Sequence, residues 1–378
     1  MFIMSAGPTS IPQRVRQAMV RDFTNTDLDE NYIAIHKATE QKVSKLLKTG
    51  ARSFLMLGEA MLGLDGACAS FTEPGARVLV LANGIFGEGF ADFVRMYGGE
   101  PVMLKFDERH GISPEELERF LKKDDRFTYA TMIHCETPTG VSNDITRLGQ
   151  ILNNHGILSV VDSVSGLVGE DIDFDAAKID CLIGGTQKCL SAPAGLTTIT
   201  LSPRAEEWLA QRETPIAGFY ANFKNYLKSG QFAFPYTPCD NLVYALDEAL
   251  DIAMESHFAK RHRSFAERTR KAIDAAGLER FALSFPSNTV TGLLLPEWAS
   301  ANDILADLQE RGYLLSGGIA HWDNRIIRIG HMGNNIADEA LYIEMLEELS
   351  RALTDADLPL RTSLADAFCS ASLDKKRD

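Results

Sequence analysis

The sequence contains few cysteines and no excess of positive charge. Its six cysteines include no C-x-x-C pair and stand in apolar segments, which predicts reduced core thiols and no metal site. No apolar run approaches the length of a membrane span, and the first residues lack the basic and apolar pattern of a signal peptide. The formal net charge of −14 disfavours nucleic acid and anionic membranes as partners. We therefore expect a soluble cytoplasmic protein that binds neither of them.

The middle of the 378-residue chain alternates short β-rich runs with amphipathic helical stretches. The expected strands cover residues 77–84, 100–106, 129–136, 157–166, 180–185 and 197–203. Because these strands are continuously apolar and helices separate most of them, they predict an α/β fold with a mostly parallel sheet covered on both faces. After about residue 240 a long helical stretch leads into an α+β pattern, which predicts a second, smaller domain.

Polar residues follow three of the expected strands, at the edge where parallel sheets bind ligands. The segments are HCETPTG (134–140), VVDSVSG (160–166) and GGTQK (184–188). Lys188 stands among glycines, threonine and apolar residues with no acid beside it, and Asp162 follows an apolar strand. Each has an ordinary alternative, because the lysine can reach water along its stem and the aspartate can cap a turn. If the two share one cleft, an acid and a free amine fit a heterocyclic cofactor that carries an aldehyde.

Six segments stand in one order along nearly the whole chain: SAGPTSIP, LANGIFGEGF, CETPTG, VVDSVSG, GGTQKCLSAPAG and RIGHMG. Together they resemble the class V branch of the fold-type I pyridoxal-phosphate aminotransferases, within the alanine–glyoxylate transaminase group. The resemblance implies the fold-type I architecture, with a mostly parallel central sheet and a smaller α+β C-terminal domain. It also implies a transaminase for amino acid and 2-oxo acid substrates that works as a homodimer or a dimer-based homo-oligomer.

The chain is accordingly expected to have four parts. An N-terminal segment, 1–14, packs near the active site, and a large ligand-binding domain covers 15–254. A small C-terminal domain covers 255–360, and the polar residues 361–378 form a frayed tail.

The resemblance implies catalytic or substrate-binding roles for three residues. Lys188 would form the Schiff base with pyridoxal 5′-phosphate and carry the proton during transamination. Asp162 would keep the pyridine nitrogen protonated, so that the ring withdraws electrons. Arg328 would bind the substrate carboxylate, for which a planar two-pronged donor is suited. The alternative for Arg328 is a sheet-edge arginine in an ion pair.

Three further residues are implied to hold the cofactor ring. Phe86 would stack on one face of the ring, and Val164 would pack against the other. Thr137 would lie near the ring hydroxyl. Two residues also match positions that hold phosphate in the wider family: Gln187, and Thr237 from the segment PYTP, which would reach the active site of the partner subunit.

The phosphate side departs from the family pattern. Family members usually place a small hydroxyl residue or a histidine in the turn that opens the first helix of the large domain, where backbone N–H groups cradle phosphate. Here LGEAMLGLDGA brings Glu59, with Ala60 and Met61, to that turn. A carboxylate repels a phosphate dianion but accepts a hydrogen bond from a neutral hydroxymethyl group. The alternative is that Glu59 caps the helix and faces solvent.

The substitution at Glu59 is similar to that of the pyridoxamine–pyruvate aminotransferase branch, in which unphosphorylated pyridoxamine is a substrate rather than part of a bound cofactor. The preferred reaction is therefore pyridoxamine plus pyruvate giving pyridoxal plus L-alanine. A pyridoxal-phosphate-dependent alanine or serine–glyoxylate (or pyruvate) transaminase is the alternative. The branch has a tyrosine where Phe86 stands and a second arginine that SGGIAHWDN (316–324) lacks; Arg325 and His321 are the candidates to replace it.

Three other functions agree less well with the sequence. Cysteine desulfurase shares the fold but needs a histidine where Gln187 stands and a reactive cysteine in a small-domain loop, whereas Cys369 lies in the expected tail. The segment GIFGEGF lacks the G-x-G-x-x-G spacing of dinucleotide-binding proteins. A non-catalytic binding protein of the same fold stays open, although the joint presence of the lysine, its acid and the arginine argues against it.

Overall fold

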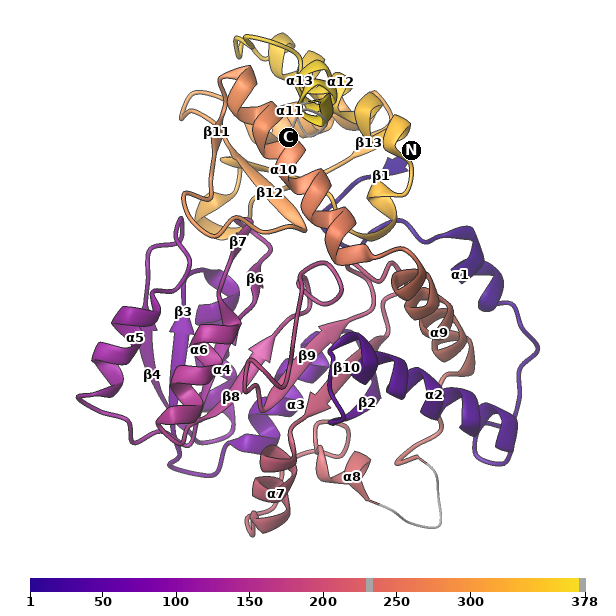
Figure 1. The fold of residues 1–378 in the computed structure, drawn as a ribbon, viewed down its shortest axis with the longest axis vertical. Helices are drawn as coiled ribbons and strands as arrows, with labels where there is room; N and C mark the ends of the chain where they lie inside the picture. The colour runs from indigo at the N-terminus through magenta and orange to yellow at the C-terminus, as the bar shows by residue number, and fades with distance from the viewer. Residues whose placement is uncertain (229–233, 374–378) are drawn as a thin grey trace.

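The computed structural model describes residues 1–228 and 234–373, and its central element is a seven-stranded sheet (Figure 1). The strand order is β2-β10-β9-β8-β5-β3-β4, and every neighbouring pair is parallel except the two that β10 makes. The strands in that order are Arg52–Leu57, Leu196–Leu201, Cys181–Gly185, Leu158–Asp162, Tyr129–Ile133, Arg77–Ala82 and Glu100–Lys105. The predicted mostly parallel sheet is confirmed.

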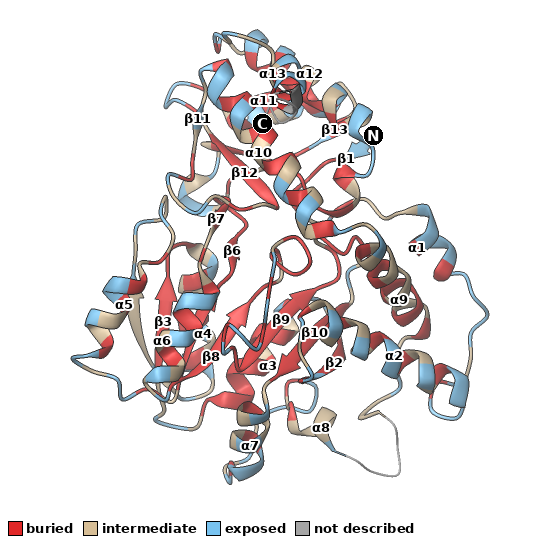
Figure 2. Ribbon diagram, in the orientation of Figure 1, coloured by how far each residue is buried: buried red, intermediate tan, exposed pale blue. Residues whose placement is uncertain are grey.

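Helices cover both faces of this sheet because its strands are apolar on both faces. In β3, Val78 and Val80 pack into one core while Leu79 and Leu81 pack into the other. The first core also contains residues of α3 (Met61–Phe71), α4 (Ile85–Met96) and α7 (Pro203–Gln211). The second core contains residues of α2 (Glu30–Leu46), α5 (Pro114–Leu121), α6 (Ile145–Asn154) and α9 (Asp240–Glu255). Figure 2 shows the central strands buried and the outer helix faces exposed.

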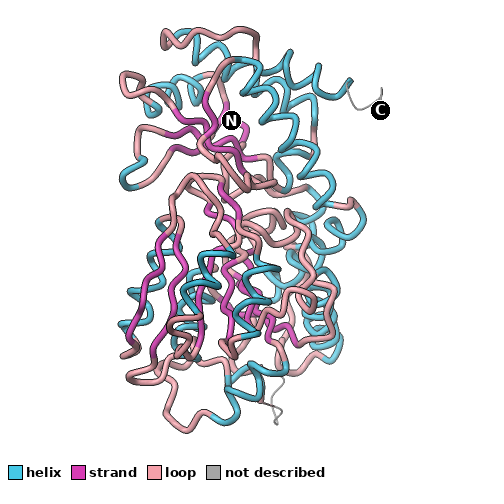
Figure 3. The backbone as a smooth tube through the Cα atoms, turned by 60° about the vertical axis from the view of Figure 1, so that its left-hand side comes forward, coloured by secondary structure: helices cyan, strands magenta, loops and turns pink. Residues whose placement is uncertain are grey.

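A smaller antiparallel sheet lies above the first in Figures 1 and 3, with strand order β11-β12-β15-β14. Its strands are Glu279–Arg280, Val290–Leu294, Ile326–Gly330 and Ser316–Gly317. A separate core joins it to the C-terminal helices α10 (Phe258–Ala276), α11 (Ala301–Glu310), α12 (Glu339–Asp355) and α13 (Leu364–Leu373). The predicted α+β C-terminal part is therefore present.

The N-terminal residues join this C-terminal part rather than the large sheet. Strand β1 (Phe2–Ile3) pairs in parallel with β13 (Tyr313–Leu314), and Figure 3 shows the N-terminus among the upper strands. The chain then descends to α1 (Gln13–Ala18), where Val15 packs against α9. The first residues of the chain thereby cross the junction between the two sheets.

A short hairpin of the large part is tied to the smaller sheet. Strands β6 (Cys135–Glu136) and β7 (Val141–Ser142) form it, and its Gly140 carbonyl accepts a hydrogen bond from Ser287 N–H (2.9 Å). Gly140 has φ +77, and a side chain there would bring a Cβ within 2.8 Å of the Val290 carbonyl oxygen. This close backbone contact requires glycine, and it holds the hairpin against β12.

Two expectations for the C-terminal half need correction. The long helical stretch after residue 240 is two helices, because His257 between α9 and α10 adopts the left-handed conformation (φ 48). The end of the chain is not a frayed tail over residues 364–373, which form α13; residues 374–378 lie outside the described part. Phe368 is fully buried, and the Arg268 guanidinium lies 3.7 Å from its ring centroid. Apolar residues at helical spacing in an otherwise polar segment account for this packing.

The break between α9 and α10 supports a domain division near residue 255, which we retain as a proposal. Within the described residues, none of the helices combines the length and the hydrophobicity that a membrane crossing requires.

Two helical glycines provide a matched test of this packing. A Cβ at Gly149 of α6 would lie 2.2 Å from the Ala177 carbonyl oxygen, whereas a Cβ at Gly89 of α4 would meet nothing within 4 Å. We expect Gly149→Ala to lower the free energy of unfolding by about 2 kcal/mol through overpacking. Gly89→Ala is expected to raise it by roughly 0.5–1 kcal/mol through helix propensity. Chemical denaturation measures both; equal effects of the two substitutions would contradict the packing described for α6.

Candidate active site

Residues predicted to act together converge at the carboxyl edge of the large sheet. Asp162 ends β8, Lys188 follows β9 by three residues, and Glu59 follows β2 by two. Because these strands are parallel to one another, their ends meet at one edge. Asp162, Lys188 and Glu59 line a cavity of about 100 Å³. Its walls are Glu59, Ala60, Met61, Leu64, Phe86, Cys135, Thr137, Asp162, Val164, Ser165 and Lys188.

Lys188 is half-buried, and its amine has no acid partner among the described residues. Its Nζ donates a hydrogen bond to the Ala6 carbonyl oxygen (3.1 Å), and among the described residues it makes no ion pair. Burial lowers the pKa of Lys188, the positive charge of Arg328 lowers it further, and the charge of Asp162 opposes both. A larger fraction of this amine is therefore neutral, and available as a nucleophile, than of an ordinary surface lysine.

The N-terminal segment forms one wall around Lys188. Gly7 has φ +94, and a Cβ there would lie 2.3 Å from Lys188 Cδ, so only glycine fits. Thr9 Oγ1 donates to the Lys188 carbonyl (3.0 Å), and Thr9 N–H donates to the Gln187 carbonyl (3.0 Å). The segment SAGPTSIP is therefore packed directly on the lysine turn, a contact between residues far apart in the sequence.

Asp162 is one of the two acidic residues that line the cavity. Its side chain is buried, and Oδ1 accepts a hydrogen bond from Val164 N–H (2.8 Å). Burial raises the pKa of Asp162 to about 6; the charge of Glu59 adds to the rise, whereas Lys188 opposes it. The carboxyl group is thus ionised at neutral pH and does not form a direct ion pair with Lys188. An acid and an amine remain free to contact a ligand between them.

Glu59 occupies the start of α3 and is held there by two donors. Its Oε2 accepts from Met61 N–H (2.9 Å), and its Oε1 accepts from the Gln187 side-chain amide. Gln187 is buried, and its own Oε1 has no partner among the described residues. Sequence reasoning placed both residues at this turn but did not find their mutual contact. Glu59 itself is exposed, as the cap alternative expects, and its carboxylate already uses two of the donors at this turn.

The remaining cavity walls are mostly apolar or weakly polar. Phe86 lies in the first turn of α4 and is 39% exposed, while Val164 approaches from the turn after β8. The Thr137 and Ser165 hydroxyls share a hydrogen bond. Cys135 and Ser165 were not predicted. Burial raises the pKa of the Cys135 thiol to about 12, so this cysteine is not a thiolate nucleophile at neutral pH.

Arg328 lies on β15, beyond the cavity walls but close enough for its charge to affect Lys188. Its Nε donates to the Gly317 carbonyl (2.6 Å), and burial lowers its pKa to about 10. Within residues 1–228 and 234–373 it makes no ion pair, which disagrees with the alternative of a paired sheet-edge arginine. Its guanidinium is therefore a desolvated cation suited to an anionic ligand.

Three other residues considered from the sequence lie elsewhere. Thr237 is exposed and donates to Asp27 (3.1 Å) rather than lining this cavity. His321 pairs with Glu108 (2.8 Å), and Arg325 donates to a backbone carbonyl (3.2 Å). Neither of the last two is positioned as a second free cation beside Arg328.

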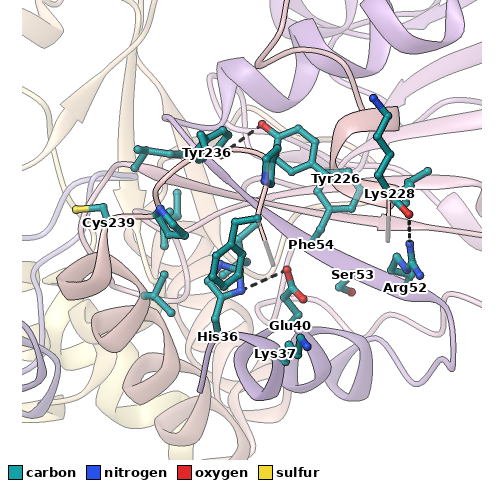
Figure 4. Close-up of a pocket in the computed structure, with 18 residues that line it drawn as sticks. His36, Lys37, Glu40, Arg52, Ser53, Phe54, Tyr226, Lys228, Tyr236 and Cys239 are labelled. Carbon is teal, nitrogen blue, oxygen red and sulfur yellow. Dashed lines mark hydrogen bonds and ion pairs between the residues drawn. The ribbon is translucent and has the colours of Figure 1, made fainter. Parts of the chain in front are cut away.

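A second cavity of about 400 Å³ lies along the edge strand β2 (Figure 4). Nδ1 of His36 lies 3.5 Å from the carboxyl group of Glu40 there, both on α2, beneath Tyr226 and Tyr236. Burial lowers the pKa of His36 to about 4 and raises that of Glu40 to about 7. Because none of the residues predicted to act in catalysis lines this cavity, the smaller cavity around Lys188 is the candidate active site. Across the described part of the chain, no group of three or more His, Cys, Asp or Glu side chains is arranged to hold a metal ion.

The opposing charges of Asp162 and Arg328 predict opposite shifts in the pKa of Lys188 when each is removed. Asp162→Asn removes the largest attraction for the ammonium form, so the pKa of Lys188 should fall further. Arg328→Leu removes a repulsion, so that pKa should rise. The pH dependence of Lys188 labelling by an aldehyde and borohydride, located by mass spectrometry, reports the direction of each shift. The exposed Lys122 serves as an internal reference. Shifts of the same sign in both variants would contradict this arrangement of charges.

Known aminotransferases are similar to this protein over most of the chain. Residues 1–318 match the family described as aminotransferase class-V. An uncharacterized aminotransferase of Methanocaldococcus jannaschii is 34% identical over 88% of this chain and 88% of its own length. A pyridoxamine–pyruvate transaminase of Mesorhizobium japonicum is 29% identical over 87% of this chain and 86% of its own.

Solved structures of aminotransferases are also similar to this chain. The crystal structure of a pyridoxamine–pyruvate aminotransferase from Mesorhizobium loti superposes with a TM-score of 0.93 at 26% identity, covering 100% of this chain and 97% of that one. The predicted fold-type I architecture is thereby confirmed.

Proposed function

The chain belongs to the class-V aminotransferase family, and we propose that within this family it transfers the amino group of unphosphorylated pyridoxamine to pyruvate, giving pyridoxal and L-alanine. The family implies pyridoxal 5′-phosphate chemistry and amino acid or 2-oxo acid substrates. The observation that carries the more specific proposal is the Glu59 carboxylate, fixed at the turn where phosphate would bind.

The ring end of a vitamin B6 compound fits the residues present. Lys188 is a half-buried amine with no acid partner among the described residues, and Asp162 is a buried carboxylate on the same cavity. Phe86 and Val164 offer apolar surface to a flat ring, and the Thr137 hydroxyl is near enough to line the same space. When bound, the pyridine ring supplies the electron-withdrawing system that stabilises negative charge at the reacting carbon.

The phosphate end does not fit equally well. The N–H of Met61 and the amide of Gln187 both donate to Glu59, and these are the groups that would otherwise face an anion at the start of α3. A dianion at this turn would lie beside the Glu59 carboxylate and be repelled by it, although solvent weakens the repulsion because Glu59 is exposed. A hydroxymethyl group is uncharged and can donate a hydrogen bond to that carboxylate. This contrast supports the unphosphorylated compound.

The protein's own groups account for binding and proton movement. We propose that Nζ of Lys188 takes the proton from the carbon that bears the amino group and returns it to the acceptor carbon, which requires the partly neutral amine that burial provides. Asp162 holds the positive charge of the ring nitrogen. Arg328 receives the substrate carboxylate, with Nε fixed by Gly317 and its terminal nitrogens free of ion pairs among the described residues.

The acceptor is proposed to be a small monocarboxylic 2-oxo acid. Arg328 can neutralise one carboxylate, whereas His321 and Arg325 are engaged elsewhere. The exposed position of Thr237, away from the cavity of its own chain, supports a homodimer in which this residue reaches the neighbouring site. A cytoplasmic location remains a proposal from the sequence.

Dialysis and ligand binding test this function. We expect the purified protein to lose its yellow chromophore on dialysis and to bind pyridoxal more tightly than pyridoxal 5′-phosphate, as followed by absorbance. Pyridoxamine and pyruvate should then yield L-alanine. A phosphorylated chromophore retained after dialysis, with alanine or serine and glyoxylate as the better substrates, would instead favour the phosphate-dependent transaminase.

Lys188→Ala tests the assignment of the amine. Because the variant lacks both the nucleophile and the proton carrier, we expect transamination to fall by at least about a thousandfold. The measurement is a single-turnover assay with pyridoxamine and pyruvate, with circular dichroism as the check on folding. Normal activity in a folded Lys188→Ala protein is incompatible with the mechanism.

Glu59→Thr tests ligand selection. Removal of the carboxylate frees Gln187 and Met61 N–H, so the affinity for pyridoxal 5′-phosphate relative to pyridoxal should rise by at least about tenfold. Glu115→Thr is the matched control, because Glu115 is also an acid in the first turn of a helix but lies in α5, away from the cavity. An unchanged affinity ratio in Glu59→Thr would exclude the selective role of Glu59.

A further inference from the structure

Glu136 lies beside the cavity without lining it. It ends strand β6, next to the cavity residue Thr137, and its side chain is fully buried. Its Oε1 accepts a hydrogen bond from Gly87 N–H (2.7 Å), and its Oε2 is buried without a partner among the described residues. Burying a carboxyl group costs free energy unless both of its oxygens are hydrogen-bonded, and here, among the described residues, only one is. The role of this side chain therefore depends on the groups that it contacts.

The contact is with the first turn of α4. This helix begins after Gly84 with no side-chain cap of its own, and Glu136 supplies an acceptor from a separate strand. The positive end of the helix favours an acceptor there. The packing is tight, since a Cβ at Gly84 would lie 2.6 Å from Glu136 Cδ. The turn therefore cannot move towards Glu136, and it loses a hydrogen bond if it moves away.

Phe86 is the cavity residue carried by this turn, between Gly84 and Gly87. Because its ring is 39% exposed, the cavity itself does not enclose it firmly. We propose that Glu136 is a positioning residue that holds the first turn of α4, and through it the Phe86 ring, at the cavity wall. The inference rests on the proposed function in one respect, namely that a vitamin B6 ring is what Phe86 faces.

The charge state of Glu136 suits this role. Burial raises the pKa of Glu136 to about 8, the N–H of Gly87 opposes the rise, and the charges of Asp162 and Glu108 add to it. The carboxyl group is therefore mostly protonated at neutral pH. A neutral acid accepts the Gly87 hydrogen bond through one oxygen without placing a second negative charge beside Asp162. An amide of the same shape should serve equally well.

Two substitutions of similar size separate the hydrogen bond from the packing. Glu136→Gln keeps an acceptor for Gly87, whereas Glu136→Met fills the space without one. In protein without ligand, we expect Glu136→Met to raise the hydrogen-exchange rates of the Phe86 and Gly87 amides by at least about tenfold, because a hydrogen bond to the turn is lost. Its Kd for pyridoxal should rise by about tenfold, while Glu136→Gln should stay within roughly twofold of the parent in both measurements.

Two further variants show whether Glu136 acts through Phe86. In a Phe86→Leu background, Glu136→Met should change the Kd for pyridoxal by less than about twofold, because coupled residues are not additive. Gly84→Ala keeps the carboxyl group but pushes a methyl group into it, and it should weaken pyridoxal binding in the same way as Glu136→Met. It also replaces Glu136→Met as the test if that variant does not fold.

Several results would overturn the inference. The first is that Glu136→Met has the exchange rates of the parent. The second is that Glu136→Gln weakens pyridoxal binding as much as Glu136→Met does. The third is that the increases in Kd caused by Glu136→Met and Phe86→Leu multiply in the double variant. Failure of the proposed function looks different. In that case the unmutated protein binds neither pyridoxal nor its phosphate, and the exchange rates of Phe86 and Gly87 still decide whether Glu136 holds the turn.

Discussion

A half-buried amine without a direct ion-pair partner is the constraint on which the site depends. Lys188 packs against Gly7 and lies near the charge of Arg328, and among the described residues its amine donates one hydrogen bond, to the Ala6 carbonyl. A tight ion pair with Asp162 would keep the amine protonated, so the separation of the two groups across a cavity is as important as their presence. The parallel strands produce that separation, because they bring both residues to one edge from different strands.

The architecture was largely predictable from the sequence, since apolar strands separated by amphipathic helices allow few alternatives to a covered parallel sheet. Lys188, Asp162, Phe86, Val164 and Thr137 were predicted to lie together, and they line one cavity. The positions of Lys188 and Asp162 at the ends of β-rich runs indicated a shared edge, whereas the roles of Phe86, Val164 and Thr137 came from the resemblance to the family. The end of the chain was misjudged, because a few apolar residues at helical spacing in a polar segment were not weighed as a buried face.

The contacts that tune the site were not predictable in the same way. The amide of Gln187 donates to Glu59 over a separation of 128 residues, and Glu136 reaches Gly87 over a separation of 49. Side-chain pairs of this kind leave no local pattern in the sequence, because they depend on the order of strands in the sheet. Glycine is a partial signal: Gly7 and Gly84 each stand where a side chain would collide with a functional residue. A glycine next to a chemically important segment therefore indicates a close approach before the partner is known.

The pairing of β1 with β13 has a consequence for how the protein is made. Residues 2–3 are synthesised long before their partner strand, residues 313–314. The carbonyl that holds the lysine amine, on Ala6, belongs to the segment that this pairing anchors. The large sheet can be assembled while synthesis continues, yet the reactive centre stays incomplete until more than three hundred residues have emerged. A nascent chain therefore exposes a finished scaffold long before it exposes a finished site, and reactivity is delayed until residues 313–314 have been made.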